Sequence, residues 1–175
     1  MRKISSLLLL ITTIFCSGQN KLTAIKSGKL IDTENGKVLN DQVILIENDT
    51  IKAVGSNILI PKDAKIPDLS NAIVLPGLID CHTHLTQQPS GDYYGDIFRK
   101  SPIDYAIVAH IYAKRTLEAG FTTCRDVGSE AFIYVALRNA INEGLIEGPR
   151  LLVATLFIGS TGSHGDLNGF SPFLD

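Results

Sequence analysis

Two histidines one residue apart are the side chains most able to do chemistry in this sequence. The run "LPGLIDCHTHL" (residues 75–85) places His82 and His84 where its hydrophobic residues end. In a β-strand, side chains two residues apart point the same way, and their α-carbons lie about 6.6 Å apart. Two imidazoles at that separation can bind one metal ion at nitrogen–metal distances of about 2.0–2.1 Å. The spacing therefore predicts a pair of metal ligands.

Asp80 is the carboxylate that precedes the pair. Strand alternation predicts that Asp80 lies on the same face as the histidines, one step further into the strand. A carboxylate there can orient a ligand or join its hydrogen-bond network, so we expect Asp80 to support the metal site without binding the ion. A bare His-x-His pattern also suits two ordinary strand-end residues. A buried strand before it favours the metal, because barrel active sites lie at the carboxyl ends of such strands.

Strands alternate with helices over residues 74–175. "IVLPGLIDCHTHL" is predicted to be one buried strand, with Pro76 and Gly77 marking an irregular entry. A helix follows in "SPIDYAIVAHIYAKRTLEAG", where Ser101 is the expected N-cap and Gly120 the stop. "FTTCRDVG", "EAFIYVALRNAINEG" and "PRLLVATLFI" then read as strand, helix and strand. This α/β order predicts parallel crossover units.

The preceding residues, 19–73, have a different pattern of short alternating segments. Turn signals such as "ENG" and "ND" separate them, which predicts a small antiparallel β unit. Residues 1–18 have the order of a signal peptide: basic residues, an apolar run, then small residues. We expect export to the periplasm or the extracellular space, with cleavage that leaves Gln19 first. Lipid attachment at Cys16 is the alternative.

Composition narrows the choice of partners. The 175 residues carry a net charge of only −2, which argues against nucleic acid as a partner. The apolar run near the N-terminus is shorter than the roughly 20 residues that a stable membrane span needs. Cys81 and Cys124 are too few for a disulfide framework, and we expect both to be small buried residues.

The residues "PGLIDCHTH" (76–84) resemble the signature "PGxIDxHxH" on the first barrel strand of the amidohydrolase superfamily. The β unit is similar to the N-terminal half of that family's composite β-sandwich. "TLEAGFTTCRDVG" and "INEGLIEGPRLLVA" resemble the branch of imidazolonepropionase-like proteins and Xaa-Pro dipeptidases. The resemblance implies hydrolysis of a C–N bond in a small-molecule or peptide substrate. Water would be activated by one or two divalent ions, with zinc expected.

Carried over residue by residue, the resemblance makes His82 and His84 ligands of the first metal. The family's carboxylated lysine, two later histidines and late aspartate have no counterpart here. A (β/α)8 barrel of the TIM type needs eight strands in about 250 residues, so we expect an incomplete barrel with its first three strands. Such a fragment is expected to be inactive alone. Its open sheet would leave an unpaired edge and an exposed apolar face.

Other polar residues outside the histidine pair could also belong to the site. "TGSHGD" follows the third strand, and the resemblance implies that His164 contacts substrate, more so than Asp166; a polar glycine turn is equally compatible. His110 lies within the first long helix and is expected to do no chemistry. Asp126 either reaches the pocket or forms an ion pair with Arg125, and the ion pair is favoured.

Several functions remain open from the residues. The leading reading is an exported metal-dependent amidohydrolase acting on peptide-like bonds. Hydrolysis of cyclic amides, as by imidazolonepropionase-like enzymes, is the second, and deamination is the third. A reading of another class is an inactive truncated remnant or a non-catalytic secreted module.

Overall fold

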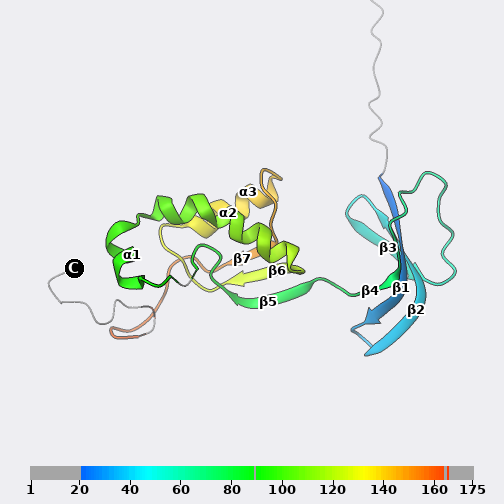
Figure 1. The fold of residues 1–175 in the computed structure, drawn as a ribbon, viewed down its shortest axis with the longest axis horizontal. Coiled ribbons are helices and arrows are strands. Elements are labelled where there is room, and N and C mark those ends of the chain that lie inside the picture. The colour runs from blue at the N-terminus through cyan, green and yellow to red at the C-terminus, as the bar shows by residue number, and fades with distance from the viewer. Residues whose placement is uncertain (1–20, 89, 164, 166–175) are drawn as a thin grey trace, which may run out of the picture. The chain divides into compact units, whose positions relative to one another are not determined.

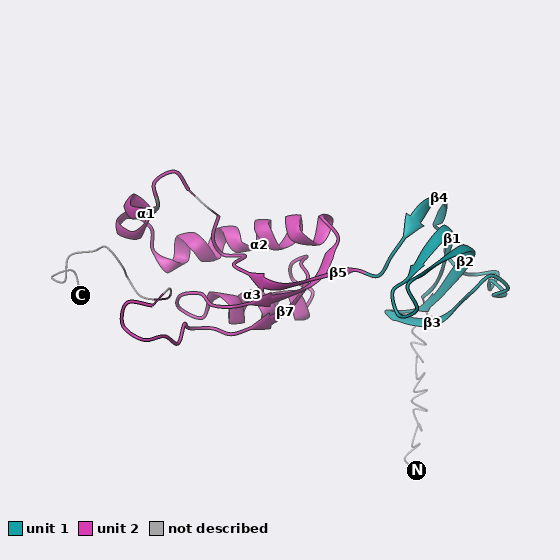
Figure 2. Cartoon of the chain, turned by 90° about the horizontal axis from the view of Figure 1, so that it is seen from below, with its two compact units in different colours: residues 1–76 teal, residues 77–175 magenta. Residues whose placement is uncertain are grey.

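The computed structural model describes residues 21–88, 90–163 and 165. The chain divides into two compact units, residues 1–76 and 77–175 (Figure 2). The division falls three residues after the boundary expected from the sequence. The expected signal peptide lies outside the described residues, and so do His164 and Asp166.

The first unit is a single four-stranded sheet. Its strands are β1 (Leu22–Asp32), β2 (Lys37–Glu47), β3 (Thr50–Gly55) and β4 (Asp68–Val74), in the order β3-β2-β1-β4 (Figure 1). The expected hairpins join β1 to β2 and β2 to β3. In the first turn, the Asp32 carboxylate accepts hydrogen bonds from the backbone of Glu34 and Asn35, at 3.1 Å each.

Strand β4 pairs parallel to β1, so the sheet is not purely antiparallel as the sequence predicted. The connection from β3 runs through residues 56–67. A connection of about a dozen residues is long enough for the chain to cross over and return in the same direction. The local alternation of hydrophobic residues contains no information about that choice.

The predicted strand through residues 73–85 is two strands in the structure. Strand β4 ends at Val74 in the first sheet, and β5 (Leu78–Thr83) begins the second. Pro76 has no N–H for a ladder hydrogen bond, and a side chain at Gly77 would collide with that of Thr122. The irregular entry expected at these two residues is therefore a break between the units.

The second unit is a parallel sheet of β5, β6 (Phe121–Asp126) and β7 (Arg150–Val153), with β6 in the centre. Helices α1 (Tyr93–Arg99), α2 (Pro102–Glu118) and α3 (Ile133–Asn142) alternate with the strands. Cys124 and its neighbour Leu151 face the helices and share a core with Ala113 and Leu137. Both long helices therefore cover one face of this sheet (Figure 1). The predicted alternation of strands and helices is confirmed.

The ends of α2 follow the sequence prediction. Pro102 is its first residue, and the Asp104 carboxylate accepts hydrogen bonds from the N–H (2.8 Å) and hydroxyl (2.6 Å) of Ser101. Gly120 follows its end with a φ of 95°, a left-handed conformation that glycine adopts readily. The capping residues thus fix where the helix begins and ends.

Helix α3 begins later than its sequence suggested, at Ile133. Ala131 and Phe132 before it have φ values of 50° and 57°, which cannot continue a right-handed helix. The short helix α1 was not expected. Asp92 caps it by accepting a hydrogen bond from the Gly95 amide at 3.0 Å.

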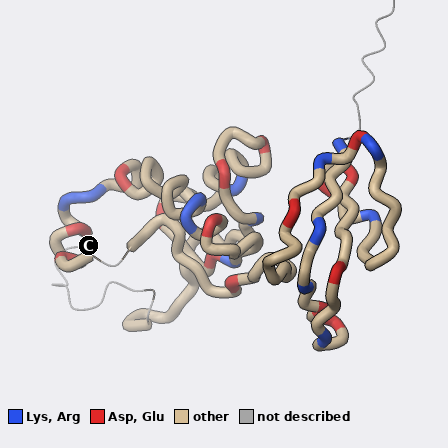
Figure 3. Tube along the Cα trace, turned by 45° about the vertical axis from the view of Figure 1, so that its right-hand side comes forward, with Lys and Arg blue, Asp and Glu red and all other residues tan. Residues whose placement is uncertain are grey.

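Within the described residues, nothing packs over the opposite face of the second sheet. Ile79 and Leu152 on that face are 67% and 56% exposed, so β5 is not the buried strand that was expected. Charges of both signs are interspersed along the chain (Figure 3). Among the described residues, no helix is both long and apolar enough to cross a membrane.

Candidate metal centre

His82 and His84 lie together at the carboxyl end of β5. Their ring centroids are 5.5 Å apart and the rings meet edge to face at 73°. Two imidazoles that share a tetrahedral ion have centroids about 3.2 Å from the ion, and therefore about 5.2 Å from each other. The observed spacing is close to that value. His82 is exposed and His84 is half-buried, so the pair opens to solution.

The His84 ring is held by a hydrogen bond to the loop after β6. Its Nδ1 lies 3.0 Å from the carbonyl oxygen of Gly128. A carbonyl only accepts, so Nδ1 carries the proton and Nε2 presents its lone pair. Metal-binding histidines commonly have such a bond on the ring nitrogen that does not face the metal. His84 therefore has the tautomer that a metal ligand needs.

Asp80 contacts the backbone of the site. Its carboxylate accepts a hydrogen bond from the His82 N–H at 3.0 Å. Asp80 pairs with Cys124, and Thr83 pairs with Asp126. The pairing register therefore shifts by one residue between Asp80 and Thr83. This irregularity interrupts the strict alternation that placed Asp80 on the histidines' face. Asp80 shapes the strand just before the ligands, while its role toward a metal stays a prediction.

Asp126 ends β6 and is fully buried. Its Oδ1 accepts a hydrogen bond from the Gly128 amide at 3.0 Å. Burial raises the pKa of this carboxyl, and the Gly128 amide and the nearby His84 oppose that rise. Arg125 is exposed at the alternate position of the strand. The favoured ion pair between Asp126 and Arg125 is therefore wrong, because their side chains leave opposite faces of the sheet.

The segment after β5 is tied to its neighbours by further hydrogen bonds. The Thr83 hydroxyl donates to the Arg125 carbonyl at 3.1 Å, and the Thr86 amide donates to the Tyr134 hydroxyl at 3.2 Å. Tyr134 is fully buried, and burial raises the pKa of its hydroxyl, so it stays neutral. Sequence reasoning missed Tyr134, because nothing local marks a helical tyrosine as a partner of this segment.

Two histidines are the protein ligands that the described residues bring together. No group of three or more His, Cys, Asp or Glu residues placed to hold a metal ion occurs in residues 21–88, 90–163 and 165. Both cysteines are free; Cys124 is buried as expected, whereas Cys81 is exposed, contrary to expectation. A divalent ion at His82 and His84 would complete its coordination with water, so the residues present suit a partial site.

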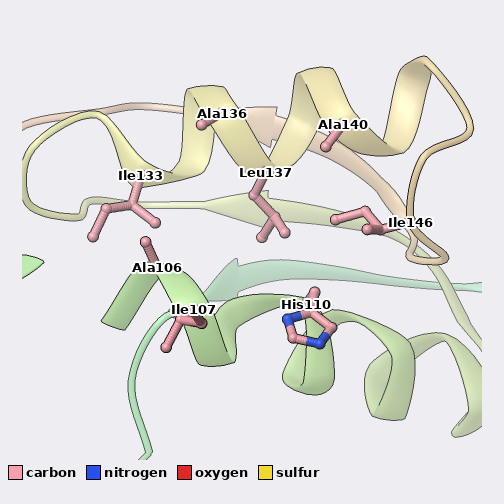
Figure 4. A pocket seen from close by; sticks show the side chains of 8 residues that line it. All are labelled: Ala106, Ile107, His110, Ile133, Ala136, Leu137, Ala140 and Ile146. Atoms are coloured by element: carbon pink, nitrogen blue, oxygen red, sulfur yellow. The ribbon is translucent and has the colours of Figure 1, made fainter. Parts of the chain in front are cut away.

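A separate apolar groove of about 310 Å³ lies between α2 and α3 (Figure 4). Its lining includes Ile107, His110 and Leu137. His110 is an exposed residue of α2 beside this groove, and the expectation that it does no chemistry stays a prediction. The groove belongs to the helical layer and not to the strand ends that carry the histidine pair.

A parallel α/β unit with a histidine pair at the end of its first strand, preceded by a β-sheet unit, is the arrangement expected from the sequence for the class of metal-dependent hydrolases. Comparison with known proteins agrees with that class. Residues 73–170 match the Amidohydrolase family, and the chain belongs to this family. Members of the family are generally dependent on divalent metals.

Three relatives illustrate the range of the family. The chain is 30% identical over 160 residues to an ochratoxinase of Aspergillus niger. The matched residues make up 88% of this chain and 32% of that protein. It is 43% identical over 75 residues to a dihydroorotase of Geobacter sulfurreducens, which covers 42% of this chain and 17% of that protein. The crystal structure of a Xaa-Pro dipeptidase with bound methionine in the active site superposes with a TM-score of 0.79 and 34% identity, covering 87% of this chain and 38% of that chain.

The chain thus spans about a third of the length of the ochratoxinase and the dipeptidase. The likeness to Xaa-Pro dipeptidase structures confirms the resemblance drawn from "TLEAGFTTCRDVG" and its neighbours. These relatives are hydrolases of amide or peptide-like bonds.

Proposed function

We propose that this chain is the N-terminal part of an exported, metal-dependent amidohydrolase that hydrolyses C–N bonds in peptide-like substrates. The observation that carries the proposal is the His82–His84 pair, with centroids 5.5 Å apart at the carboxyl end of β5. The tautomer of His84, set by Gly128, supports it. Family membership supports the reaction class.

In this proposal His82 and His84 hold a divalent ion, and zinc is the expected one because imidazole nitrogen suits it. A bound divalent ion lowers the pKa of water and polarises the carbonyl of the bond to be cleaved. The chain's own residues prepare that site. Gly128 fixes the His84 ring, and Asp80 holds the backbone at His82. Phe157 lies beside His84, with ring centroids 6.2 Å apart and the rings tilted by 38°.

Peptide-like substrates are favoured over cyclic amides by the extent of the likeness. The Xaa-Pro dipeptidase structure covers 87% of this chain, whereas the dihydroorotase likeness covers 42%. The latter keeps cyclic amides as the second candidate. His164, outside the described residues, is proposed to contact the substrate carboxylate or carbonyl, since an imidazole can donate a hydrogen bond to either.

Metal binding tests the core of the proposal. Titration of the purified chain with Co²⁺, followed by absorption, should reveal a site that His82→Ala and His84→Ala each remove. His110→Ala is the matched control, because it deletes an exposed histidine of α2 and should leave the titration unchanged. Equal loss in all three variants, or none in the first two, contradicts the proposal.

The substrate class is tested on the whole gene product that carries this chain. We expect the Zn²⁺-loaded protein to hydrolyse Xaa-Pro dipeptides faster than dihydroorotate or related ring amides, by product detection after matched incubations. Faster ring opening would favour the second candidate. Turnover of neither class at metal saturation would favour the non-catalytic reading.

Export is a separate part of the proposal, and it rests on the first 18 residues alone. Arg2 and Lys3, the apolar run and the small residues around Gly18 have the order that signal peptidases recognise. N-terminal sequencing of material from the cell exterior or periplasm should begin at Gln19. A retained Met1, or a lipid on Cys16, contradicts cleavage at this position.

A further inference from the structure

Asp126 accepts a hydrogen bond from the loop that holds His84, but its bond is to the Gly128 amide and not to the Gly128 carbonyl that His84 contacts. Its Oδ1 accepts the hydrogen bond of the Gly128 N–H at 3.0 Å, and the Gly128 carbonyl accepts that of His84 Nδ1 at 3.0 Å. One residue, Gly128, thus carries both bonds. The Asp126 carboxylate and the His84 imidazole thus meet the same residue, one at its N–H and the other at its carbonyl.

The carboxylate of Asp126 lies where a charge is costly to bury. The Asp126 side chain is fully buried, and no hydrogen bond of good geometry reaches its Oδ2 within the described part of the chain, although the Ala154 amide and the Tyr134 hydroxyl lie close enough to lower the pKa of the carboxyl. Burying a carboxylate with an oxygen left unpaired costs free energy. Of the groups around this carboxylate, the Gly128 amide belongs to the residue whose carbonyl meets His84.

The loop around Gly128 is constrained on both sides. The Val127 amide donates to the Thr83 carbonyl at 3.3 Å, and the Ser129 amide donates to the Thr155 carbonyl at 2.7 Å. Gly128 itself has a φ of 147°, and a side chain there would lie 2.6 Å from a carbon of the Phe157 ring. The Ser129 amide belongs to the same peptide unit as the Gly128 carbonyl, so Thr155 holds one side of that carbonyl, and the Asp126 bond holds the Gly128 amide on the other side of the α-carbon.

We propose that Asp126 is a positioning residue that acts through Gly128 to hold His84 in the Nδ1–H tautomer, leaving Nε2 to bind the metal. The proposal rests on the proposed function, since it assigns Asp126 a purpose toward that metal site. It extends the site from the histidine strand to the end of β6. Asp126 itself touches neither metal nor substrate.

The experiment reads the tautomer without any metal. In the purified chain labelled with ¹⁵N-histidine, long-range ¹H–¹⁵N spectra at about pH 8 report which ring nitrogen of His84 is protonated. Wild type should show the Nδ1–H form. Asp126→Ala should show a mixture with the Nε2–H form. Its dissociation constant for Co²⁺ should rise about tenfold, the lower end of the range for losing a group that supports a ligand.

Two variants separate positioning from general loosening. Asp126→Asn keeps an acceptor for the Gly128 amide and should retain the wild-type tautomer. Thr83→Val removes the neighbouring bond between β5 and the Arg125 carbonyl, at similar volume, and should retain it as well. A tautomer shift of equal size in Thr83→Val, or none in Asp126→Ala, overturns the proposal.

The wild-type spectrum keeps the test decisive if Asp126→Ala does not fold. An Nε2–H tautomer at His84 in wild type overturns the proposal by itself. Asp126→Ser takes the place of Asp126→Ala if the alanine variant does not fold. The metal-free readout also separates this inference from the proposed function. If His84→Ala leaves Co²⁺ binding unchanged, the metal function fails. If the titration depends on His84 but the tautomer ignores Asp126, the positioning role fails.

Discussion

The ring centroids of His84 and His82 are 5.5 Å apart, and Nδ1 of His84 is 3.0 Å from the Gly128 carbonyl oxygen. His84 is therefore prepared by a hydrogen bond before any metal binds, whereas His82 is exposed on the strand end. A ligand that is already oriented loses less conformational entropy on binding. The two histidines should contribute to one site from different starting states.

The first prediction compares the ligands with their support. His82→Ala and His84→Ala should each remove one of the two protein ligands and abolish stoichiometric Zn²⁺ binding. Asp80→Asn should lower the affinity by about 10-fold to 100-fold at most, since a supporting group is lost and the ligands remain. Elemental analysis after dialysis against limiting metal measures all three. Full zinc occupancy in either alanine variant contradicts the assignment of the pair.

The second prediction concerns the close approach of β1 and β4. Gly28 lies where the pairing register of these strands shifts, and a side chain there would collide with the backbone carbonyl of Ser70. Gly28→Ala should lower the free energy of unfolding by about 2 kcal/mol, because a backbone atom cannot move aside as a flexible side chain can. Urea denaturation of the full chain measures it.

Gly55→Ala is the matched control for that substitution. Gly55 lies in β3 of the same sheet, and an added carbon there would meet Ile58 at 3.6 Å, an ordinary contact. It should change the free energy of unfolding by no more than about 0.5 kcal/mol. Similar effects of both variants would mean that strand propensity, and not the contact with Ser70, governs the response.

Local patterns predicted those elements whose causes are local. The caps of α2 at Ser101 and Gly120, the hairpin turns and the alternation of strands with helices all depend on residues a few positions apart. The histidine pair is of the same kind, since its spacing appears in three consecutive residues. For these features the sequence contains both the pattern and its physical cause.

Features that depend on distant pairing escaped prediction. His84 meets Gly128 across 44 positions, and Thr86 meets Tyr134 across 48. The position of Asp126 beside the end of the histidine strand follows from the register of β6 against β5, which no single segment specifies. "CRDVG" offered one usable signal: Asp126 alternates with Cys124, so an apolar position for Cys124 predicts that Asp126 is buried too.

The third prediction follows from the cap of α2. Hydrogen bonds from the Ser101 hydroxyl and backbone hold the pKa of the Asp104 carboxyl below its ordinary value. The stabilisation from a carboxylate with a lowered pKa is present above its ordinary pKa of about 3.9, and is lost as the pH falls through the lowered value. Asp104→Asn should therefore lower the urea midpoint at pH 7 and have little effect at pH 2.5.

The control for this pH dependence is Asp63→Asn, which changes an exposed carboxylate in the connector between β3 and β4. It should leave the urea midpoint unchanged at both pH values. Ser101→Ala should lower the urea midpoint at pH 7 in the same direction as Asp104→Asn, because it removes the hydroxyl that donates to this carboxylate. A loss in Asp104→Asn that persists undiminished in acid would contradict the role of the carboxylate's charge.

The last prediction is that the isolated 175-residue chain does not turn over amide substrates, even at saturating Zn²⁺. Catalytic zinc sites generally have three protein ligands and an open position for water, whereas His82 and His84 are the two ligands brought together in the described residues. His82 is also exposed among the described residues, so water would reach an ion held there. Incubation of metal-loaded chain with Xaa-Pro dipeptides, with product separated by chromatography, should give no turnover above a His82→Ala, His84→Ala double variant. Sustained turnover that the double variant lacks would show that two histidines and solvent are enough for catalysis in this fold.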